Sequence, residues 1–439
     1  MKIGFIGCGY VFDHYMTTLA RHPSLKIAGV CDIDAARATR VGDFYNLKVY
    51  DSAQTLLADA TIDTVVNLTS IPSHYSVSRA ILEAGKHLYS EKPLTMTMEE
   101  AHALADLAKA RNLRLSAAPS NALSATVQTL WSLVDQGAVG DVRMVYAEFD
   151  DNPVYLLSPE KWVSRSGAPW PYLHEYEMGC TWEHAGYHLG WMCMLFGPVR
   201  HVTAFSRKTL PDKTDQPLEP AGTPDFSVAT LDFENGVVAR LTCSIAAPVD
   251  HRMRIIGNRG EVSADTYRHY EAPVRLDPFV PFSLKARNAA SIRRHSVLGA
   301  LFGVGGRRVP LLRTPPPGDT LLRDEIAGQG PKAWLKRLRR REFGQQDKCL
   351  GLAELADAIN TNRAHFPSPA FTLHITELTL AIQGAGPDGA CQRLTTRFDP
   401  MQQSPQLRAA APDYIKWTRL GPVPRFLSKI LSRAGARRA

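Results

Sequence analysis

The chain has 439 residues, of which 44% are apolar and 21% charged, a composition typical of globular proteins and unlike that of disordered ones. This length exceeds what one hydrophobic core usually supports, so we expect two domains. The net charge of +8 is unevenly distributed. Residues 285–341 contain 14 basic and three acidic residues, a net charge of +11, which leaves about −3 on the rest of the chain. The basic segment and the near-neutral body therefore need separate explanations.

The cysteines and the first residues bear on the cell compartment. The seven cysteines are odd in number and scattered, and no two have Cys-x-x-Cys spacing, so we expect free thiols in a reducing cytosol and no bound metal. The chain begins directly with a short apolar stretch, without the pattern of a signal peptide. It has no run of about 18 apolar residues that could span a bilayer. These features predict a cytoplasmic protein.

Residues 1–120 alternate short apolar runs with amphipathic helical patterns, which is typical of an α/β domain with a parallel sheet. In residues 98–111, Ala101, Leu104 and Ala108 recur with the period of a helix. We predict six strands, at residues 2–7, 26–32, 47–50, 64–69, 87–90 and 114–118. The pattern indicates a Rossmann-type, doubly wound domain, whose ligand binds at the carboxyl ends of the strands.

The pattern changes from about residue 140, where longer strands follow. We predict these at residues 144–150, 201–208, 227–233, 237–245 and 253–257. Asn235-Gly236 lies between two of them and predicts a two-residue hairpin turn. The second domain is therefore expected to be α+β, with an open, mainly antiparallel sheet.

The two patterns divide the chain into four parts. We assign residues 1–120 to the parallel-sheet domain, and residues 121–265 together with 345–400 to the α+β domain. The second range includes two predicted helices, over 351–363 and 373–382. The remaining parts are a basic insertion at 266–344, rich in proline, glycine and arginine, and a basic C-terminal tail at 401–439.

The first predicted strand ends in Gly7 and Gly9. Two glycines allow a tight turn and the close approach of a pyrophosphate to the N-terminus of the next helix. Tyr10 and Val11, at the start of that helix, are expected to contact the same ligand. The third position of this dinucleotide fingerprint is Phe12 instead of glycine or alanine, so helix and strand are expected to pack less closely there.

Asp32 stands at the end of the second strand, where a carboxylate accepts hydrogen bonds from ribose hydroxyls and repels a 2′-phosphate. We therefore expect NAD in preference to NADP, with Ile33 beside the adenosine. Arg37 lies close enough to bear on the choice between NAD and NADP, but we favour its interpretation as a solvated helix residue. The structural alternative for Asp32 is a helix N-cap, a role that Asp34 fits better.

Two further segments follow strands and bring polar side chains to the same edge of the sheet. The first is the run from Asn67 to His74, and the second is Glu91-Lys92-Pro93. An isolated Glu-Lys pair is usually a surface ion pair. At a strand end, however, the ammonium of Lys92 is expected to enter the cofactor cleft, where it can hydrogen-bond a hydroxyl or carbonyl oxygen.

The order of these motifs resembles that of the glucose–fructose oxidoreductase/inositol dehydrogenase/MocA family, and the Glu91-Lys92-Pro93 strand end is its most specific mark. The resemblance extends over residues 1–265 and 345–385. It implies that Lys92 contacts the substrate and that Glu91 orients it, with both beside the cofactor. It further implies a cofactor lining made by four residues of the preceding loop: Thr69, Ser70, Pro72 and His74.

A predicted helix at residues 179–196 carries two histidines at positions i and i+4, His184 and His188, which can share one face. Members of the resembled family often have Asp-x-Gly-x-His here. Gly186 and His188 fit that pattern, whereas His184 replaces the aspartate. The resemblance implies that His188 acts as the general acid/base, with His184 beside it. The alternatives are a zinc site, for which no third ligand is apparent, and a purely structural core helix.

The segment before this helix is rich in aromatic residues. Trp162 and Trp170 are our candidates for stacking on a sugar ring, and the alternative is that both pin a loop into the domain interface.

Basic stretches at 331–341 and 425–433 need an explanation of their own. In the second, apolar residues are flanked by basic ones, a pattern of helices that lie on anionic membrane surfaces. One hypothesis is therefore peripheral contact with the inner membrane face. The alternatives are a phosphorylated ligand, nucleic acid, or a partner subunit. No nucleic-acid-binding module is recognisable, so we expect no such partner.

Together these features predict an NAD-dependent oxidoreductase acting on a sugar, sugar acid, cyclitol or nucleotide-linked sugar. Two alternatives stay open: a glycosidase or epimerase that uses NAD with no net redox change, and a non-catalytic protein of the same fold. An open antiparallel sheet usually needs covering, so we also expect a homo-oligomer.

Overall fold

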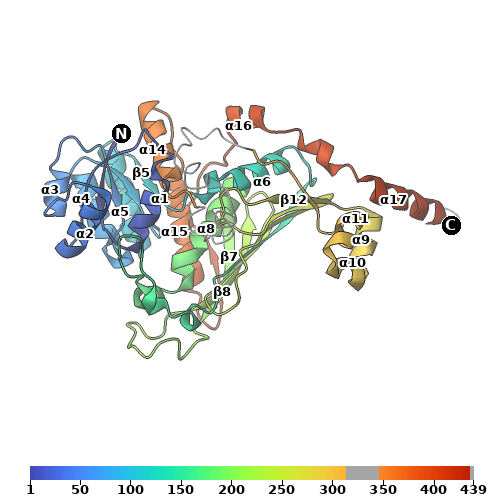
Figure 1. Ribbon diagram of the computed structural model, residues 1–439, viewed down its shortest axis with the longest axis horizontal. Helices are drawn as coiled ribbons and strands as arrows, with labels where there is room; N and C mark the ends of the chain where they lie inside the picture. The colour runs from blue at the N-terminus through green and yellow to red at the C-terminus, as the bar shows by residue number, and fades with distance from the viewer. Residues whose placement is uncertain (313–345, 436–439) are drawn as a thin grey trace, which may run out of the picture.

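The computed structural model describes residues 1–312 and 346–435. Figure 1 shows the first sheet with its helices at one end of the molecule, the second sheet in the middle, and a group of helices at the other end. Within the described ranges, no helix is both long enough and apolar enough to cross a bilayer.

The first sheet is the predicted parallel sheet, with strand order β2-β1-β3-β4-β5. Its strands are β1 (Lys2–Ile6), β2 (Lys26–Cys31), β3 (Thr64–Asn67), β4 (His87–Ser90) and β5 (Leu115–Ala117). The helices that follow them are α1 (Tyr10–Leu19), α2 (Ala35–Tyr45), α3 (Ala53–Leu57), α4 (His74–Glu83) and α5 (Met98–Ala110). The Rossmann-type prediction is thus confirmed.

One predicted strand, at residues 47–50, is absent from this sheet as an element. The segment makes only an isolated parallel bridge, between Val49 and Val30. The reason that no strand forms here lies in the next residues. Ser52 is the N-cap of α3, and its side chain accepts a hydrogen bond from the Thr55 amide. The chain therefore turns into a helix before a strand can extend.

The second sheet has nine strands in the order β13-β12-β11-β10-β6-β9-β8-β7-β14. All neighbouring strands are antiparallel except β6 and β9, which are parallel. The strands are β6 (Val142–Asp150), β7 (Val199–Arg207), β8 (Phe226–Phe233), β9 (Val238–Ser244), β10 (Met253–Gly257), β11 (Gly260–Ala264), β12 (Val274–Pro278), β13 (Arg307–Arg308) and β14 (Ala390–Arg393). The predicted open, mainly antiparallel sheet is confirmed.

The hairpin predicted at Asn235-Gly236 joins β8 to β9, but its loop is longer than two residues. The Phe233 amide donates to the Val237 carbonyl at 3.0 Å, which closes the loop. Gly236 has a φ of +86°, a conformation that other residues rarely adopt. The Asn235 side chain accepts a hydrogen bond from the Val237 amide at 3.0 Å. The turn residues were therefore correctly identified, and the loop length was not.

The start of the predicted insertion is more regular than its sequence suggests. It contains β12 and β13, which extend the second sheet, and three short helices. These helices are α9 (Pro281–Asn288), α10 (Ala290–Arg294) and α11 (Ser296–Phe302). Strand β12 can be assigned only from its pairing in the sheet. Its residues Val274 and Leu276 are fully buried in the hydrophobic core.

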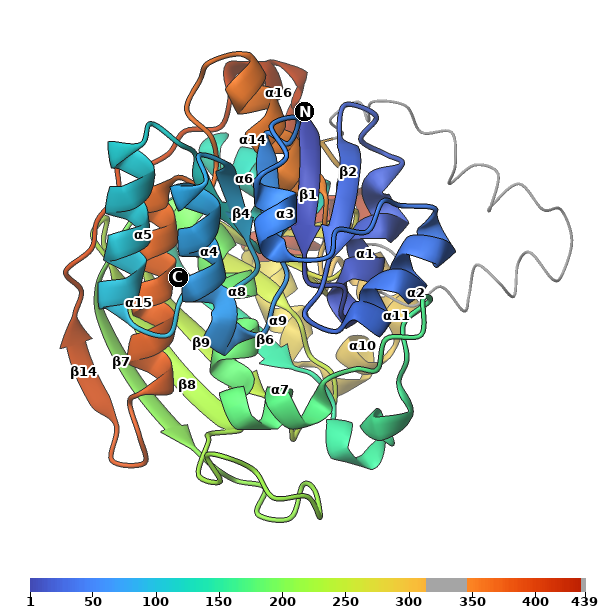
Figure 2. The same cartoon turned by 90° about the vertical axis from the view of Figure 1, so that its left-hand side faces the viewer.

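Helices from later in the chain pack on the two sheets or on one another. They are α6 (Ala125–Asp135), α7 (Tyr172–Met178), α8 (Cys180–Phe196), α14 (Leu350–Asn360) and α15 (Pro369–Gln383). Helix α15 contacts α5 on one side and α8 and β7 on the other (Figure 2). Leu352 and Leu355 of α14 pack with Phe5 and Phe12 in the core of the first sheet. The two sheets are therefore held together by helices distant in sequence.

Candidate active site

The glycine turn after β1 has the geometry that a dinucleotide-binding loop needs. Gly7 has a φ of +102°, and a Cβ there would lie 2.6 Å from the Leu68 carbonyl, so only glycine fits. Gly9 is the N-cap of α1, and a Cβ on it would meet nothing within 4 Å. Open space at a helix N-terminus suits a pyrophosphate. Phe12 is fully buried, with its ring 5.2 Å from that of Phe5, so an aromatic contact fills the third fingerprint position.

Asp32 follows β2 and faces the glycine turn. Its Oδ2 accepts a hydrogen bond from the Cys8 amide at 2.7 Å, and its Oδ1 accepts one from the Asp34 amide at 2.9 Å. Arg37 Nη1 lies 3.4 Å from Oδ1, so the arginine is close to the carboxylate. The N-cap of α2 is Asp34, as the sequence suggested. Ile33 is fully exposed beside this carboxylate.

The loop after β3 is tied to the loop after β4 by His74. Its Nδ1 lies 2.7 Å from the Pro93 carbonyl, and its Nε2 lies 3.1 Å from the Thr69 carbonyl. The imidazole is 1% exposed, and burial lowers its pKa. His74 thus holds the two loops together from inside, whereas Ser70 and Pro72 are exposed.

Lys92 points from the end of β4 toward α8, where its Nζ makes a short hydrogen bond and ion pair with Glu183. Both side chains are mostly buried, with exposed fractions of 14% and 12%. Burial opposes the charge of Lys92, but the attractions of Glu183, Tyr187 and Glu175 together outweigh it and raise the pKa of Lys92. Burial also raises the pKa of Glu183. The pair is therefore a charged lysine beside a carboxylate that accepts protons more readily than usual.

His184 has a carboxylate partner from outside its own helix. Its Nε2 lies 2.8 Å from Glu175 Oε1 of α7, and its ring stacks on Phe149 with centroids 4.3 Å apart. Burial opposes ionisation of Glu175, but His184 outweighs it and lowers the pKa of Glu175. His184 Nδ1 is buried and has no hydrogen-bond partner among the described residues. Glu175 and Glu183 thus place two carboxylates near position 184, where members of the resembled family often have an aspartate.

His188 occupies a different environment. It is fully buried, and both ring nitrogens are engaged: Nδ1 accepts from the Trp191 indole at 2.9 Å, and Nε2 donates to the Glu148 carbonyl at 2.8 Å. Burial lowers the pKa of His188 to about 3. A neutral imidazole with both nitrogens satisfied links α8 to β6. This geometry does not favour the proton-transfer role expected for it.

A buried charged network behind these residues was not found from the sequence. Arg268 donates to Asp151, and Lys348 Nζ lies 3.6 Å from Glu91 Oε1 and donates to the Tyr187 hydroxyl at 3.0 Å. Arg268 and Lys348 come from the insertion and the segment after it, so no local motif could have identified them. Both cations are at most 7% exposed. Their positive charges offset the negative charges of the nearby carboxylates of Asp151 and Glu91.

Glu91 lies deeper than Lys92 and is also held by other groups. It accepts a hydrogen bond from the Tyr15 hydroxyl at 3.0 Å and one from the Lys92 amide at 3.2 Å. Burial opposes its charge, but Lys348 and Lys92 outweigh burial and lower its pKa. Glu91 therefore fixes the backbone at Lys92, in line with the orienting role that the resemblance implies.

The two candidate tryptophans lie together in one loop. Their ring centroids are 4.8 Å apart, and the Trp170 amide donates to the Trp162 carbonyl at 2.8 Å. The tip of this loop reaches the first sheet's helices, where Ser166 Oγ donates to Asp13 Oδ2 at 2.7 Å. The rings pack on each other and against the hydrophobic core of the second sheet. This arrangement matches the interface role more closely than stacking on a free sugar.

Across residues 1–312 and 346–435, no cluster of three or more histidine, cysteine, aspartate or glutamate side chains has the geometry of a metal site. The described part of the cleft contains instead a glycine turn, an acidic residue after β2, and a buried lysine–carboxylate pair. This combination on a Rossmann-type sheet defines a dinucleotide-binding oxidoreductase.

The chain belongs to the Gfo/Idh/MocA family of oxidoreductases. The family's NAD-binding Rossmann-fold profile matches residues 1–118, and its C-terminal-domain profile matches residues 127–263. A curated relative, trans-1,2-dihydrobenzene-1,2-diol dehydrogenase of Bos taurus, is 24% identical over 265 residues, which are 59% of this chain and 72% of that protein.

Solved structures have the same fold at low sequence identity. The WlbA dehydrogenase from Bordetella pertussis, in complex with NADH and UDP-GlcNAcA, is 18% identical with a TM-score of 0.62, over 90% of this chain and 98% of that one. A levoglucosan dehydrogenase in complex with NADH and levoglucosan is 19% identical with a TM-score of 0.64, over 87% and 96% of the two chains.

Proposed function

We propose that the protein is an NAD-dependent oxidoreductase that transfers a hydride between nicotinamide and a hydroxyl-bearing carbon of a sugar, sugar acid, cyclitol or nucleotide-linked sugar. The observation that carries this proposal is the buried Lys92–Glu183 pair at the end of β4, on the same sheet edge as Gly7 and Asp32. The dihydrodiol, levoglucosan and UDP-sugar named for the relatives all carry hydroxyl groups, which supports this substrate class.

The cofactor proposal rests on the fit of the strand-end residues. Gly7 and Gly9 leave room for a pyrophosphate at the N-terminus of α1, and Tyr10 and Val11 begin that helix. Asp32 would exchange its amide contacts for the ribose hydroxyls, which favours NAD because a 2′-phosphate would be repelled. When bound, the cofactor would supply the hydride acceptor or donor.

In this proposal Thr69, Ser70 and Pro72, in the loop after β3, would also line the cofactor. The Thr69 hydroxyl and amide both contact Asn67 Oδ1, at 2.7 and 3.1 Å, so the loop is preformed. A preformed loop costs little ordering entropy on binding. In this proposal His74 acts as a positioning residue for that loop and does not touch the cofactor.

Lys92 and Glu183 would transfer the proton of the reacting substrate hydroxyl. The ammonium donates a hydrogen bond to the reacting oxygen. During oxidation Lys92 would first pass one of its protons to Glu183, whose raised pKa makes it a suitable acceptor, and the resulting amine would take the hydroxyl proton of the substrate. The unpartnered Nδ1 of His184 is available for a second substrate hydroxyl. This scheme needs no proton from His188.

A two-part experiment tests the proposal. NADH and NADPH are titrated into the protein while cofactor fluorescence is followed, and NAD reduction is then measured with a panel of sugars, sugar acids, cyclitols and sugar nucleotides. We expect tighter binding of NADH and NAD reduction with at least one panel class. Failure to bind either cofactor would overturn the proposal.

We also propose that the protein forms a homo-oligomer through the open face of the second sheet. Met144 and Val238 are apolar and 40% and 41% exposed on adjacent strands of that face. Next to them, the Arg240 guanidinium lies 4.7 Å from the centre of the Tyr146 ring. Native mass spectrometry of the full chain should report a multimer, and a strictly monomeric mass would contradict this.

A further inference from the structure

The end of the molecule farthest from the first sheet is a separate basic group of helices (Figure 1). We call α9, α10, α11 and α17 (Pro422–Gly435) the basic tip, because α17 contacts both α9 and α11. Residues 281–308 contain six lysines and arginines, residues 419–430 contain three, and neither segment contains an aspartate or glutamate. The proposed oxidoreductase chemistry uses none of them.

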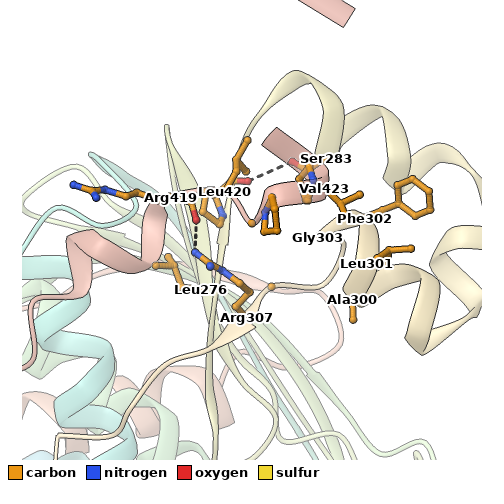
Figure 3. Close-up of a pocket in the computed structure, with 15 residues that line it drawn as sticks. Leu276, Ser283, Ala300, Leu301, Phe302, Gly303, Arg307, Arg419, Leu420 and Val423 are labelled. Atoms are coloured by element: carbon orange, nitrogen blue, oxygen red, sulfur yellow. Dashed lines mark hydrogen bonds between the residues drawn. The ribbon is translucent and has the colours of Figure 1, made fainter. Parts of the chain in front are cut away.

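Part of this charge is used to hold the tip together. Arg307 of β13 donates to the carbonyls of Trp417 and Arg419, and Arg287 pairs with Asp277 of β12. Figure 3 shows the residues from Arg419 to Val423 crossing above Leu276 and Arg307, next to the helices. They close over a mainly apolar cavity of about 220 Å³. The orientation of α17 is therefore fixed by the fold.

Other cations of the basic tip lie beside apolar side chains that face water. On α17, Phe426 and Ile430 lie one turn apart and are 64% and 48% exposed. Arg425 and Lys429 precede them and are also exposed, and Arg425 Nη2 donates to the Leu420 carbonyl at 2.9 Å. A helix that contacts a folded protein normally buries its large apolar residues, so exposure at two successive turns indicates a surface that is covered by something else.

The neighbouring helices also combine exposed apolar side chains with exposed basic ones. Leu284 of α9 and three large apolar residues of α11 are exposed, the most exposed being Val297 at 78%. Lys285, Arg293 and Arg294 are exposed on α9 and α10. Exposed apolar side chains interspersed with cations, with no acidic residue among them, have the composition of an interfacial membrane-binding surface.

We propose that the basic tip docks onto an anionic lipid bilayer, with Phe426 and Ile430 inserted and the surrounding lysines and arginines on the lipid headgroups. Charge complementarity selects this occupant. A second copy of the same surface would bring like charges together, which costs binding energy. Nucleic acid would use the cations but would leave the aliphatic side chains exposed. The other basic stretch considered from the sequence, 331–341, lies outside the described residues.

The test measures sedimentation of the full chain with vesicles of phosphatidylcholine alone and of phosphatidylcholine mixed with phosphatidylglycerol. We expect binding only to the anionic vesicles and weaker binding at high salt. Since each basic residue near the surface contributes about fivefold, Arg425→Glu with Lys429→Glu should weaken partitioning by about 25-fold or more. Phe426→Ser with Ile430→Ser should weaken it by about tenfold or more.

The matched control is Lys26→Glu with Lys109→Glu, which makes the same charge change at exposed positions of the Rossmann domain and should leave binding close to that of the wild type. Turnover and cofactor binding should be unchanged in the tip variants, which separates this proposal from that of the active site. No binding to anionic vesicles would overturn it. So would vesicle binding that survives both tip variants, or tip-dependent binding to a DNA duplex or a second copy without binding to vesicles.

Discussion

The two walls of the cleft differ in how their side chains are held. On the strand-end wall, Gly7, Asp32 and Lys92 follow β1, β2 and β4, and the parallel order of the strands alone brings them to one edge. On the α7–α8 wall, the partners come from different elements: Glu175 binds His184, and Glu183 binds Lys92. The first wall is thus specified by the topology of the backbone, and the second by side-chain contacts that only the folded structure defines.

The largest effect is expected where the two walls meet. Lys92→Ala should lower turnover by about 10²–10⁴-fold, because it removes the group that exchanges a proton with the substrate oxygen. NADH affinity should change far less. Steady-state kinetics with an active panel substrate would measure this, with Lys161→Ala, an exposed lysine of the tryptophan loop, as control. Turnover within threefold of wild type in Lys92→Ala would refute the role of the lysine.

Replacing His188 tests whether this residue of α8 has a structural or a catalytic role. His188→Phe leaves the Trp191 indole N–H and the Glu148 carbonyl without partners, which should destabilise the protein by about 2–4 kcal/mol. Turnover per folded molecule should be retained. Denaturant unfolding and kinetics would be compared with His102→Phe, at an exposed histidine of α5. A stable His188→Phe protein with turnover reduced a hundredfold would restore the general acid/base interpretation.

The same burial makes stability depend on pH. The pKa of His188 is lowered to about 3 and that of His374 to about 4, both by burial, from an ordinary value of 6.5. The unfolded chain therefore binds more protons below pH 6.5, so stability falls on acidification. By pH 5 each histidine should cost up to about 2 kcal/mol. Denaturant unfolding between pH 7 and 5 would measure the slope, which should be shallower in His188→Phe; an unchanged slope would argue against a neutral His188.

A smaller effect is expected on the strand-end wall, at Asp32. Asp32→Ala should weaken NADH binding by about tenfold, the value of a charge-assisted hydrogen bond, and should narrow the difference between NADH and NADPH. Asp34→Ala is the matched control, since it removes the α2 cap and should affect stability instead of cofactor choice. Equal loss of both cofactors in Asp32→Ala would contradict discrimination at the 2′ position.

The sequence was informative where a local pattern determines geometry. The parallel sheet followed from alternating apolar runs, and Gly7 from a turn that excludes a side chain. It was less informative where the role of a residue depends on a distant partner. His184 and His188 have the same spacing in any helix, yet one faces a carboxylate and the other a backbone carbonyl. Lys348 belongs to no sequence motif, and its role can be inferred only from its position beside Glu91 in the structure.

The tertiary contacts of the insertion were equally hidden. Strands β12 and β13 complete the edge of the sheet, but each is short and flanked by proline or glycine, so neither has a clear alternating pattern. The pairing of β12 with β11, and of β13 with β12, stabilises both strands where the sequence pattern is weak.

The most direct measurement of the central claim, that Lys92 and Glu183 act together on the substrate proton, is the pH dependence of hydride transfer in Glu183→Gln under single-turnover conditions. The carboxylate of Glu183 raises the pKa of Lys92. Removing it takes away the proton acceptor for oxidation and lowers that pKa, so oxidation should slow and the alkaline limb of its pH profile should move to lower pH, while NADH binding is retained. A profile that superimposes on that of the wild type would contradict the account.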